Sequence, residues 1–326
     1  MPARVDVPVD KYRGAVRQVT LGAGPDAGGT RKRVVVVGGE TGLPFLGFEG
    51  SVPNPPVVGI EITAQPPEGW SEPLHEAWGD SVMADPAAWA AKAEQAGADL
   101  IFLSVQDTGQ HQLSATEFAA RVKAVLQATG LPLIVVGPGS AERDNELLVA
   151  VADAAKGERL ALGRCEDKNY RTIVAAAMAN GHLVVASSPI DVNLAKQLNI
   201  LIRDMNLPLE RVLMDPTTGA LGYGLEYTYS VMERLRLAAL QGDEMTQQPM
   251  ICTIGQEAWR QKESRVGEGM PPEWGDWRRR AVLWEAVTAT SLIHSGADIV
   301  ILRHPQSVAL VKQNVAELAA AYARRV

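Results

Sequence analysis

The chain has 326 residues, of which 46% are hydrophobic and 21% are charged, and its formal net charge at pH 7 is −7. This composition is typical of a globular protein, and the acidic balance disfavours a nucleic-acid partner, because such a partner requires a basic face. No apolar run reaches the roughly 18 residues of a membrane span, and the N-terminal segment lacks the apolar core of a secretory signal. We therefore expect a protein that does not insert into membranes, and the presence of only two cysteines, with no disulfide framework, predicts a reducing cytoplasm.

The N-terminal part, residues 1–56, differs in pattern from the rest of the chain. Two β-rich runs, Val16–Leu21 and Arg33–Val37, flank a turn rich in Gly, Asp and Pro, which predicts a β-hairpin. Residues 41–56 form an irregular connector rich in Pro and Gly. Because an isolated hairpin is only marginally stable, we expect it to pack against the following domain, residues 57–326.

From residue 57 onward, short apolar runs alternate with helical patterns. The first helix is predicted after Asp85 as its N-cap, with Pro86 at the first helical position and Gly97 beyond its end. Later helices are predicted at Ser114–Thr129, Glu142–Lys156, Asn169–Asn180, Asp191–Met205, Leu225–Gln241, Trp277–His294 and Gln306–Arg324. The strand runs are residues 57–63, 99–105, 131–137, 160–165, 183–188, 211–216, 249–254 and 298–303.

This alternation predicts the fold. The strand runs are continuously apolar, as expected for strands covered on both faces, and strict β-then-α order implies parallel crossovers. Eight such units match an α/β fold of the (β/α)8 TIM barrel type, here with an N-terminal β-hairpin extension. A doubly wound open sheet is the alternative, but no G-x-G-x-x-G follows the first strand.

The loop Asp215–Gly224, DPTTGALGYG, follows the sixth strand and therefore lies at the C-terminal mouth, where barrels of this type place their sites. We predict that Asp215, Thr217 and Thr218 face the mouth and that Gly219 and Gly222 let the backbone approach a ligand. The alternative is that the loop serves only turn formation, since turns use the same residue types. The other predicted mouth residues, also chosen because they follow strands, are Asp107, Asp191 and Asn193.

Long loops with two tryptophans each follow the first and seventh strands, which predicts a wide, partly apolar mouth for a large ligand or partner. The sixth strand ends in Asp215 and not in the lysine of a Schiff-base enzyme. His111 and His304 follow strands and are candidates for a role at the mouth, whereas His182 and His294 are predicted to lie at helix C-termini as dipole or capping groups. The spacing of the histidines predicts no three-ligand metal site.

The two cysteines, Cys165 and Cys252, are too few for a four-cysteine cluster or a structural zinc site within one copy of the chain. Both fall at or within predicted strands, and we expect small buried hydrophobes. With no catalytic residue or metal ligand assigned, the mouth suits a protein that covers a cofactor held by another subunit.

Three segments carry a resemblance to a known family: Val37–Ile62, Cys165–Asn199 and Leu213–Leu240. They resemble the small subunit of the corrinoid iron–sulfur protein, which is also the delta subunit of the acetyl-CoA decarbonylase/synthase complex. The resemblance extends over essentially the whole chain. It implies a barrel that forms a heterodimer with a large subunit, and the large subunit holds a [4Fe–4S] cluster.

The resemblance further implies a corrinoid of the cobalamin type between the large subunit and the mouth of this barrel. A methyltetrahydrofolate methyltransferase supplies a methyl group, which passes to acetyl-CoA synthase/CO dehydrogenase in the Wood–Ljungdahl pathway. The chain would then be a non-catalytic subunit of a methyl carrier. None of its five histidines lies two residues after an aspartate, so the D-x-H-x-x-G pattern of a cobalt-ligating module does not occur.

Two enzyme hypotheses remain as alternatives. A pterin-binding methyltetrahydrofolate methyltransferase could use Asp107, Asn193 and Asp215 to hold the pterin. A metabolic barrel enzyme of other chemistry is the second alternative. Both predict turnover without a partner subunit.

Overall fold

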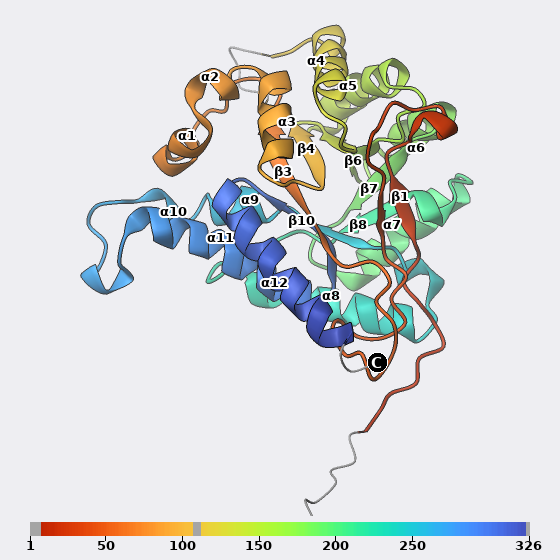
Figure 1. Cartoon of the computed structure of the whole chain (residues 1–326). Helices are drawn as coiled ribbons and strands as arrows, with labels where there is room; N and C mark the ends of the chain where they lie inside the picture. Colours follow the sequence, from red (N-terminus) through yellow and green to blue (C-terminus); the bar gives the residue numbers. More distant parts are fainter. Residues whose placement is uncertain (1–7, 107–111, 324–326) are drawn as a thin grey trace, which may run out of the picture.

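The computed structural model describes residues 8–106 and 112–323. Eight parallel strands close into a barrel in the order β10-β3-β4-β5-β6-β7-β8-β9 (Figure 1). The predicted (β/α)8 fold is confirmed, and the open-sheet alternative is wrong because β10 pairs with both β3 and β9. The barrel strands are β3 (Val57–Thr63), β4 (Leu100–Ser104), β5 (Leu133–Val136), β6 (Ala161–Cys165), β7 (Leu183–Ser187), β8 (Val212–Asp215), β9 (Met250–Cys252) and β10 (Ala297–Leu302).

One long helix follows each barrel strand and covers its outer face. These helices are α3 (Pro86–Gln95), α4 (Ala115–Ala128), α5 (Ala141–Ala154), α6 (Tyr170–Asn180), α7 (Val192–Asp204), α8 (Leu225–Leu240), α11 (Trp277–His294) and α12 (Pro305–Ala323). Local caps explain why the helix starts were predictable: Asp85 Oδ1 accepts a hydrogen bond from Ala87 N at 3.0 Å, and Ser114 forms a capping box with Glu117.

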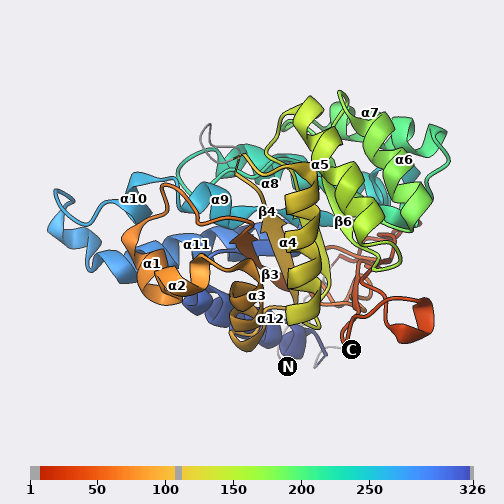
Figure 2. The same cartoon turned by 90° about the horizontal axis from the view of Figure 1, so that it is seen from above.

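Short helices that were not predicted lie in the long loops after β3 and β9. They are α1 (Glu72–Trp78), α2 (Asp80–Met83), α9 (Ile254–Ala258) and α10 (Lys262–Arg265). Within the described residues, 3-10 turns also occur at Pro25–Ala27, Leu209–Arg211, Glu244–Thr246 and Pro272–Trp274. Figures 1 and 2 show α1 and α10 at the opposite end of the barrel from the N-terminal hairpin.

The hairpin consists of β1 (Val19–Leu21) and β2 (Val35–Val37), which pair antiparallel and are shorter than predicted. Its inward side chains join the cluster inside the barrel, which includes Leu100, Phe102 and Leu183. Gly22 N donates to Arg159 O at 3.1 Å, and Lys32 N donates to Gly130 O at 3.0 Å. Both acceptors precede barrel strands, so the hairpin closes the N-terminal end of the barrel.

A buried arginine fastens the hairpin to the barrel. Arg31 pairs with Glu158 at 2.9 Å and donates further hydrogen bonds to the carbonyls of Leu126, Thr129 and Leu131. These charge-assisted bonds satisfy most of the guanidinium donors of Arg31. The division of the chain at residues 56/57 stays a prediction, because the hairpin and the barrel share one interior cluster.

Both cysteines are fully buried, as expected. Burial raises the pKa of the Cys165 and Cys252 thiols, which keeps both protonated at neutral pH. None of the helices in the described ranges combines the length and hydropathy required to cross a bilayer.

Candidate functional site

The C-terminal mouth of the barrel has a polar floor. Interior positions at the ends of four strands carry Glu61, Ser104, Ser187 and Asp215. Glu61 is the centre of this floor. Its Oε2 forms an ion pair with Arg303 Nε at 2.7 Å. Its Oε1 accepts hydrogen bonds from Ser104 Oγ at 3.0 Å and from the side-chain amide of Gln256. The carboxylate is therefore satisfied from three sides, which fixes the side chains around it.

Two cavities open above this floor. The first, which we name the loop cavity, has about 660 Å³ and is lined by Arg164, Glu166, Asp167, Lys168, Ser187, Ser188, Pro189, Asp215, Thr217, Thr218, Thr253, Gln256, Glu257 and Arg260. The second, the arginine cavity, has about 290 Å³ and is lined by Glu61, Glu68, Gly69, Trp70, Ser104, Val105, Gln106, Val136, Gly137, Pro138, Arg164, Gln256, Trp259, Arg260, Arg265 and Arg303.

Arg164, Gln256 and Arg260 line both cavities, so the two are halves of one mouth. Arg164 Nη2 donates to Gln256 Oε1 at 3.0 Å, and Gln256 Nε2 donates to Glu61 Oε1 at 2.9 Å. This relay of side chains joins the end of β6 to the end of β3 through α9. It forms the boundary between the two halves.

The loop after β8 brings Asp215, Thr217 and Thr218 into the lining of the loop cavity. Asp215 Oδ2 accepts from Ser187 Oγ at 3.2 Å, and its Oδ1 accepts from Thr217 N at 3.0 Å. Burial raises the pKa of Asp215, while the hydrogen bond from Thr217 and the charge of Arg164 oppose that shift. The carboxyl thus shapes the loop as well as lining the cavity.

Thr217 has a φ of 67°, in the left-handed region that β-branched residues rarely adopt. Its hydroxyl donates to Ser188 O at 2.6 Å, which ties the loop to the end of β7. Thr218 Oγ1 accepts from Thr253 N at 2.9 Å, which ties the loop to the end of β9. Both hydroxyls therefore already have partners within the chain.

The glycines of this loop serve its internal packing. A Cβ at Gly219 would lie 2.5 Å from the carbonyl of Gly224, and Gly219 N donates to Thr228 Oγ1 at 2.7 Å. Gly222 adopts a φ of +74°, which favours glycine. The loop therefore does both things that were predicted as alternatives: some of its residues line the cavity, and its glycines form the turn.

The remaining predicted site residues lie elsewhere. Asp191 caps α7 by accepting from Asn193 N at 2.7 Å and from Leu194 N at 3.0 Å, and neither Asp191 nor Asn193 lines a mouth cavity. Gly219 and Gly222 do not line these cavities either. Asp107 and His111 lie outside the described residues. That any of these residues contacts a cofactor stays a prediction.

The tryptophans of the long loops contribute to the mouth in part: Trp70 and Trp259 line the arginine cavity, whereas the exposed Trp274 lines neither mouth cavity. Trp70, Trp78 and Trp259 in the long loops are buried, because their rings pack into the shell between strands and helices. Trp70 and Trp78 both contact Trp89, with ring centroids 5.3 Å and 6.0 Å apart. Polar and apolar groups therefore both line the mouth.

Two histidines have positions that the sequence did not indicate. His304 is buried and stacks on Trp259 at 5.8 Å between ring centroids, and burial lowers its pKa to about 4. His182 is also buried: its Nδ1 accepts from Leu160 N at 3.1 Å and its Nε2 lies 2.9 Å from Ala152 O. It joins the start of β6 to α5, so the predicted capping role of His182 is wrong.

Several residues of the mouth were missed from the sequence, among them Glu61, Arg164, Gln256, Arg260, Arg265 and Arg303. A signal existed for three of them, because Glu61, Arg164 and Arg303 lie within or at the end of apolar strand runs, where a charged side chain must face the mouth or pair inside the barrel. Within the described ranges, no group of three His, Cys, Asp or Glu side chains could hold a metal ion.

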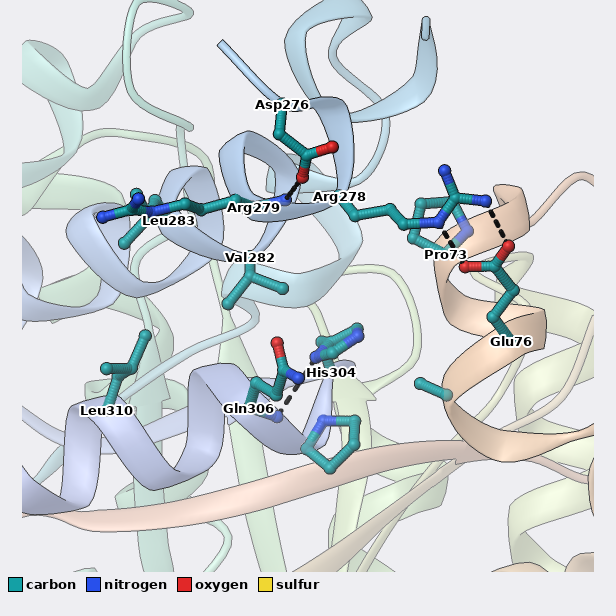
Figure 3. A pocket seen from close by; sticks show the side chains of 12 residues that line it. Pro73, Glu76, Asp276, Arg278, Arg279, Val282, Leu283, His304, Gln306 and Leu310 are labelled. Carbon is teal, nitrogen blue, oxygen red and sulfur yellow. Dashed lines mark hydrogen bonds and ion pairs between the residues drawn. The ribbon is translucent and has the colours of Figure 1, made fainter.

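A separate hollow of about 680 Å³ lies outside the ring of strands, among α1, α11 and the start of α12 (Figure 3). Arg278 pairs across it with Glu72 and Glu76, and Asp276 caps α11 by accepting from Arg279 N at 2.8 Å. It shares no lining residue with the two mouth cavities.

Comparison with known proteins gives a consistent result over most of the chain. The model of the family described as CO dehydrogenase/acetyl-CoA synthase delta subunit matches residues 18–315. The chain is 40% identical over 304 residues to the acetyl-CoA decarbonylase/synthase complex subunit delta of Methanopyrus kandleri, covering 92% of this chain and 74% of that protein. It is 39% identical over 310 residues to the subunit delta of Methanothermobacter thermautotrophicus, covering 94% and 76%.

Among solved structures, the chain is similar to dihydropteroate synthases. The enzyme from Xanthomonas albilineans in complex with 7,8-dihydropteroate has a TM-score of 0.55 at 16% identity, covering 83% of this chain and 95% of that chain. The enzyme from Coxiella burnetii in complex with pteroic acid has a TM-score of 0.55 at 13% identity, covering 85% and 99%. At these identities the likeness shows the shared TIM-barrel fold alone.

Proposed function

The chain belongs to the family of the CO dehydrogenase/acetyl-CoA synthase delta subunit, and on that premise we propose that it is the small subunit of a heterodimeric corrinoid iron–sulfur protein. In this proposal the barrel mouth covers a corrinoid whose other face is held by the large subunit. A methyltetrahydrofolate methyltransferase and acetyl-CoA synthase would dock on the same assembly in the Wood–Ljungdahl pathway. The observation that carries the proposal is the family match, which includes all eight strands and the Asp215–Gly224 loop.

The lining of the loop cavity fits the edge of a corrinoid, which presents amide groups that both donate and accept hydrogen bonds. Donors are available from Lys168 and Arg260, and acceptors from Glu166, Asp167 and Glu257. Ser188 Oγ is buried in this wall without a hydrogen-bond partner in the described part of the chain. Such an orphaned group at a cavity wall is consistent with a polar ligand that completes it.

When bound, the corrinoid supplies the atom that carries the methyl group. The residues of this chain would orient that cofactor and keep water away from one face of it. Rigidity suits this role: the Glu61 hydrogen bonds hold the floor, and Thr217 and Thr218 tie the loop to β7 and β9. No bond-making step is assigned to the chain.

The two thiols support placing the iron–sulfur cluster in the large subunit. Cys165 and Cys252 are fully buried, and the raised pKa of each thiol disfavours the thiolate that a cluster requires. His304, which follows β10, is buried against Trp259 and lines neither mouth cavity, so it is not placed to ligate cobalt.

The proposal is tested by coexpression with the large subunit and measurement of corrinoid absorbance per heterodimer. Lys168→Trp and Glu257→Trp place bulk in the loop cavity, and we expect each to lower corrinoid occupancy while the heterodimer still forms. Arg234→Trp, on the exposed face of α8, is the matched control and should retain the cofactor. Wild-type occupancy in both mouth variants would contradict the proposal.

The chain alone provides a second arm of the test. We expect no saturable binding of methyltetrahydrofolate in the absence of the large subunit. Saturable binding by the isolated chain would instead favour the pterin-binding methyltransferase alternative.

A further inference from the structure

The arginine cavity has a charge that contrasts with the rest of the molecule. Its lining contains Arg164, Arg260, Arg265 and Arg303 against two glutamates, Glu61 and Glu68, a formal charge of +2. The whole chain carries −7. Low-dielectric walls concentrate the field of such a cluster, so this half of the mouth attracts anions.

Arg303 is held in place but keeps free donors. Its Nε pairs with Glu61 at 2.7 Å, and its guanidinium lies 4.3 Å from the ring centroid of Trp70. Across the residues that the structure describes, its two Nη groups have no hydrogen-bond partner. A guanidinium fixed through one nitrogen and one stacking contact is preorganised to donate with the others.

Arg164, on the opposite side of the cavity, is also held through one nitrogen and keeps its other donors. Its Nη2 is used by Gln256, whereas its Nε and Nη1 have no hydrogen-bond partner in the described ranges. No carboxylate of the described residues lies within ion-pair distance of Arg164 or of Arg265, which is exposed at the end of α10. Among the residues that the structure describes, Arg260 forms an ion pair with the neighbouring Glu257 alone, and because its side chain is 70% exposed, that pair is weak and can open.

We propose that the arginine cavity binds a phosphate group. A phosphate monoester carries about −1.5 to −2 charges at neutral pH, which matches the formal charge of the lining. Its three terminal oxygens can accept from several guanidinium groups at once, whereas a carboxylate offers only two oxygens. The arginines come from the end of β6, from α9–α10 and from the end of β10, so they surround the ligand.

This inference goes beyond the corrinoid proposal and does not depend on it, because phosphate binding is measured on the chain without the large subunit, although Arg164 and Arg260 line both cavities. The experiment is calorimetric titration of the purified full chain at low salt with inorganic phosphate, ribose 5-phosphate, dimethyl phosphate and acetate. We expect saturable binding of one phosphate probe or more, weakening with added NaCl, and at least about tenfold weaker binding of acetate. Preference for ribose 5-phosphate would assign the site to a terminal phosphate, and preference for dimethyl phosphate to a phosphate within a larger ligand.

The variants are Arg164→Gln, Arg265→Gln and the double variant, because neither arginine is paired with a carboxylate that its loss would leave buried. Each single change should weaken phosphate binding about tenfold, since a charge-assisted hydrogen bond is lost, and the double variant should abolish it. Arg234→Gln removes one positive charge from the outer face of α8 and should leave the affinity unchanged. Circular dichroism and thermal melting confirm folding of every variant.

Three results would overturn the proposal: no saturable phosphate binding in the wild type, acetate binding as tightly as phosphate, or wild-type affinity in the folded double variant. None of them bears on corrinoid occupancy of the heterodimer. Failure of this proposal and failure of the corrinoid proposal are therefore distinguishable.

Discussion

Arg303 and Glu61 lie 242 positions apart in the sequence, and their side chains meet in the floor of the mouth with Arg303 Nε 2.7 Å from Glu61 Oε2. They stand at the ends of β10 and β3, the two strands whose pairing closes the ring. The same carboxylate also accepts from Ser104 and Gln256. This pair therefore links closure of the barrel to the geometry of both cavities.

Removal of the Glu61 carboxylate should destabilise the chain strongly. The Glu61 side chain is 2% exposed and that of Arg303 is 12% exposed, so Glu61→Ala leaves a nearly buried guanidinium without its partner. We expect a loss of about 3 kcal/mol in the free energy of unfolding, measured by urea denaturation. Asp204→Ala breaks the exposed pair with Arg203 and should cost less than about 0.5 kcal/mol. Equal effects of the two substitutions would contradict the buried-pair interpretation.

Asp144 should make stability depend on pH. Its side chain lies under the β5–α5 loop, where Oδ1 accepts from Gly139 N at 3.0 Å, and burial raises its pKa to about 6. The folded state holds this proton more tightly than the unfolded chain does. The contribution of Asp144 is therefore fully present below the unfolded pKa near 4 and is lost as the pH rises to about 6, by on the order of 2–3 kcal/mol.

Asp144→Asn removes this titration and keeps an acceptor for Gly139. Urea denaturation at pH 4 and pH 7 should show the variant gaining about 2–3 kcal/mol relative to the wild type between the two values. Asp204→Asn, at an exposed carboxyl, is the control and should show no comparable gain. A constant difference between Asp144→Asn and wild type across this range would rule the effect out.

The hairpin should contribute to barrel stability through one face of β2. Val37 is fully buried in the cluster inside the barrel, whereas its neighbour Val36 is exposed. Val37→Ala leaves a cavity at the N-terminal end of the barrel and should cost about 2 kcal/mol, while Val36→Ala should change stability by less than about 0.5 kcal/mol. Thermal and urea denaturation of the two single variants test this, and a similar small effect at both positions would show that the hairpin is only loosely attached.

Thr228 should control the order of the mouth loop. Its buried Oγ1 accepts from Gly219 N at 2.7 Å and lies 3.3 Å from Thr217 O. Thr228→Val keeps the shape but leaves Gly219 N unpaired, which should cost about 1–3 kcal/mol. Amide hydrogen exchange in the Asp215–Gly224 loop should then become faster. Thr228→Ser retains the hydroxyl and removes only the methyl group, so it should preserve slow exchange. Fast exchange in Thr228→Ser would contradict the assignment of the effect to the hydroxyl.

Much of the fold could be predicted because its signals are local. The apolar strand runs and the caps at Asp85 and Ser114 depend on residues a few positions apart, and the helix bounds in the structure agree with the predicted ones within two residues. The burial of Cys165 and Cys252 followed from their places in those runs. The short helices α1, α2, α9 and α10 were not predicted, because each has at most seven residues and therefore little hydrophobic periodicity.

The site could be predicted only in part. The prediction that Asp215, Thr217 and Thr218 lie at the mouth is confirmed, because these residues follow a strand and parallel strands place their carboxyl ends at one rim. The same argument predicted Asp191 and Asn193 at the mouth, but neither lines a mouth cavity. The Asp191 carboxylate accepts hydrogen bonds from the backbone in the first turn of α7. The tryptophans of the long loops were expected at the mouth, and Trp70, Trp78 and Trp259 are buried because burying an indole ring is more favourable than solvating it, whereas Trp274 is exposed.

The sequence by itself determined the eight strand–helix units, their order and the end of the barrel at which the polar loops meet, because hydrophobic periodicity and capping act over short distances. Only the tertiary structure decided that the hairpin closes the opposite end, that Glu61 pairs with Arg303, and that four arginines line one half of the mouth. These contacts join residues from distant units. They depend on strand register and on the closure of the ring, and no local pattern encodes either of these.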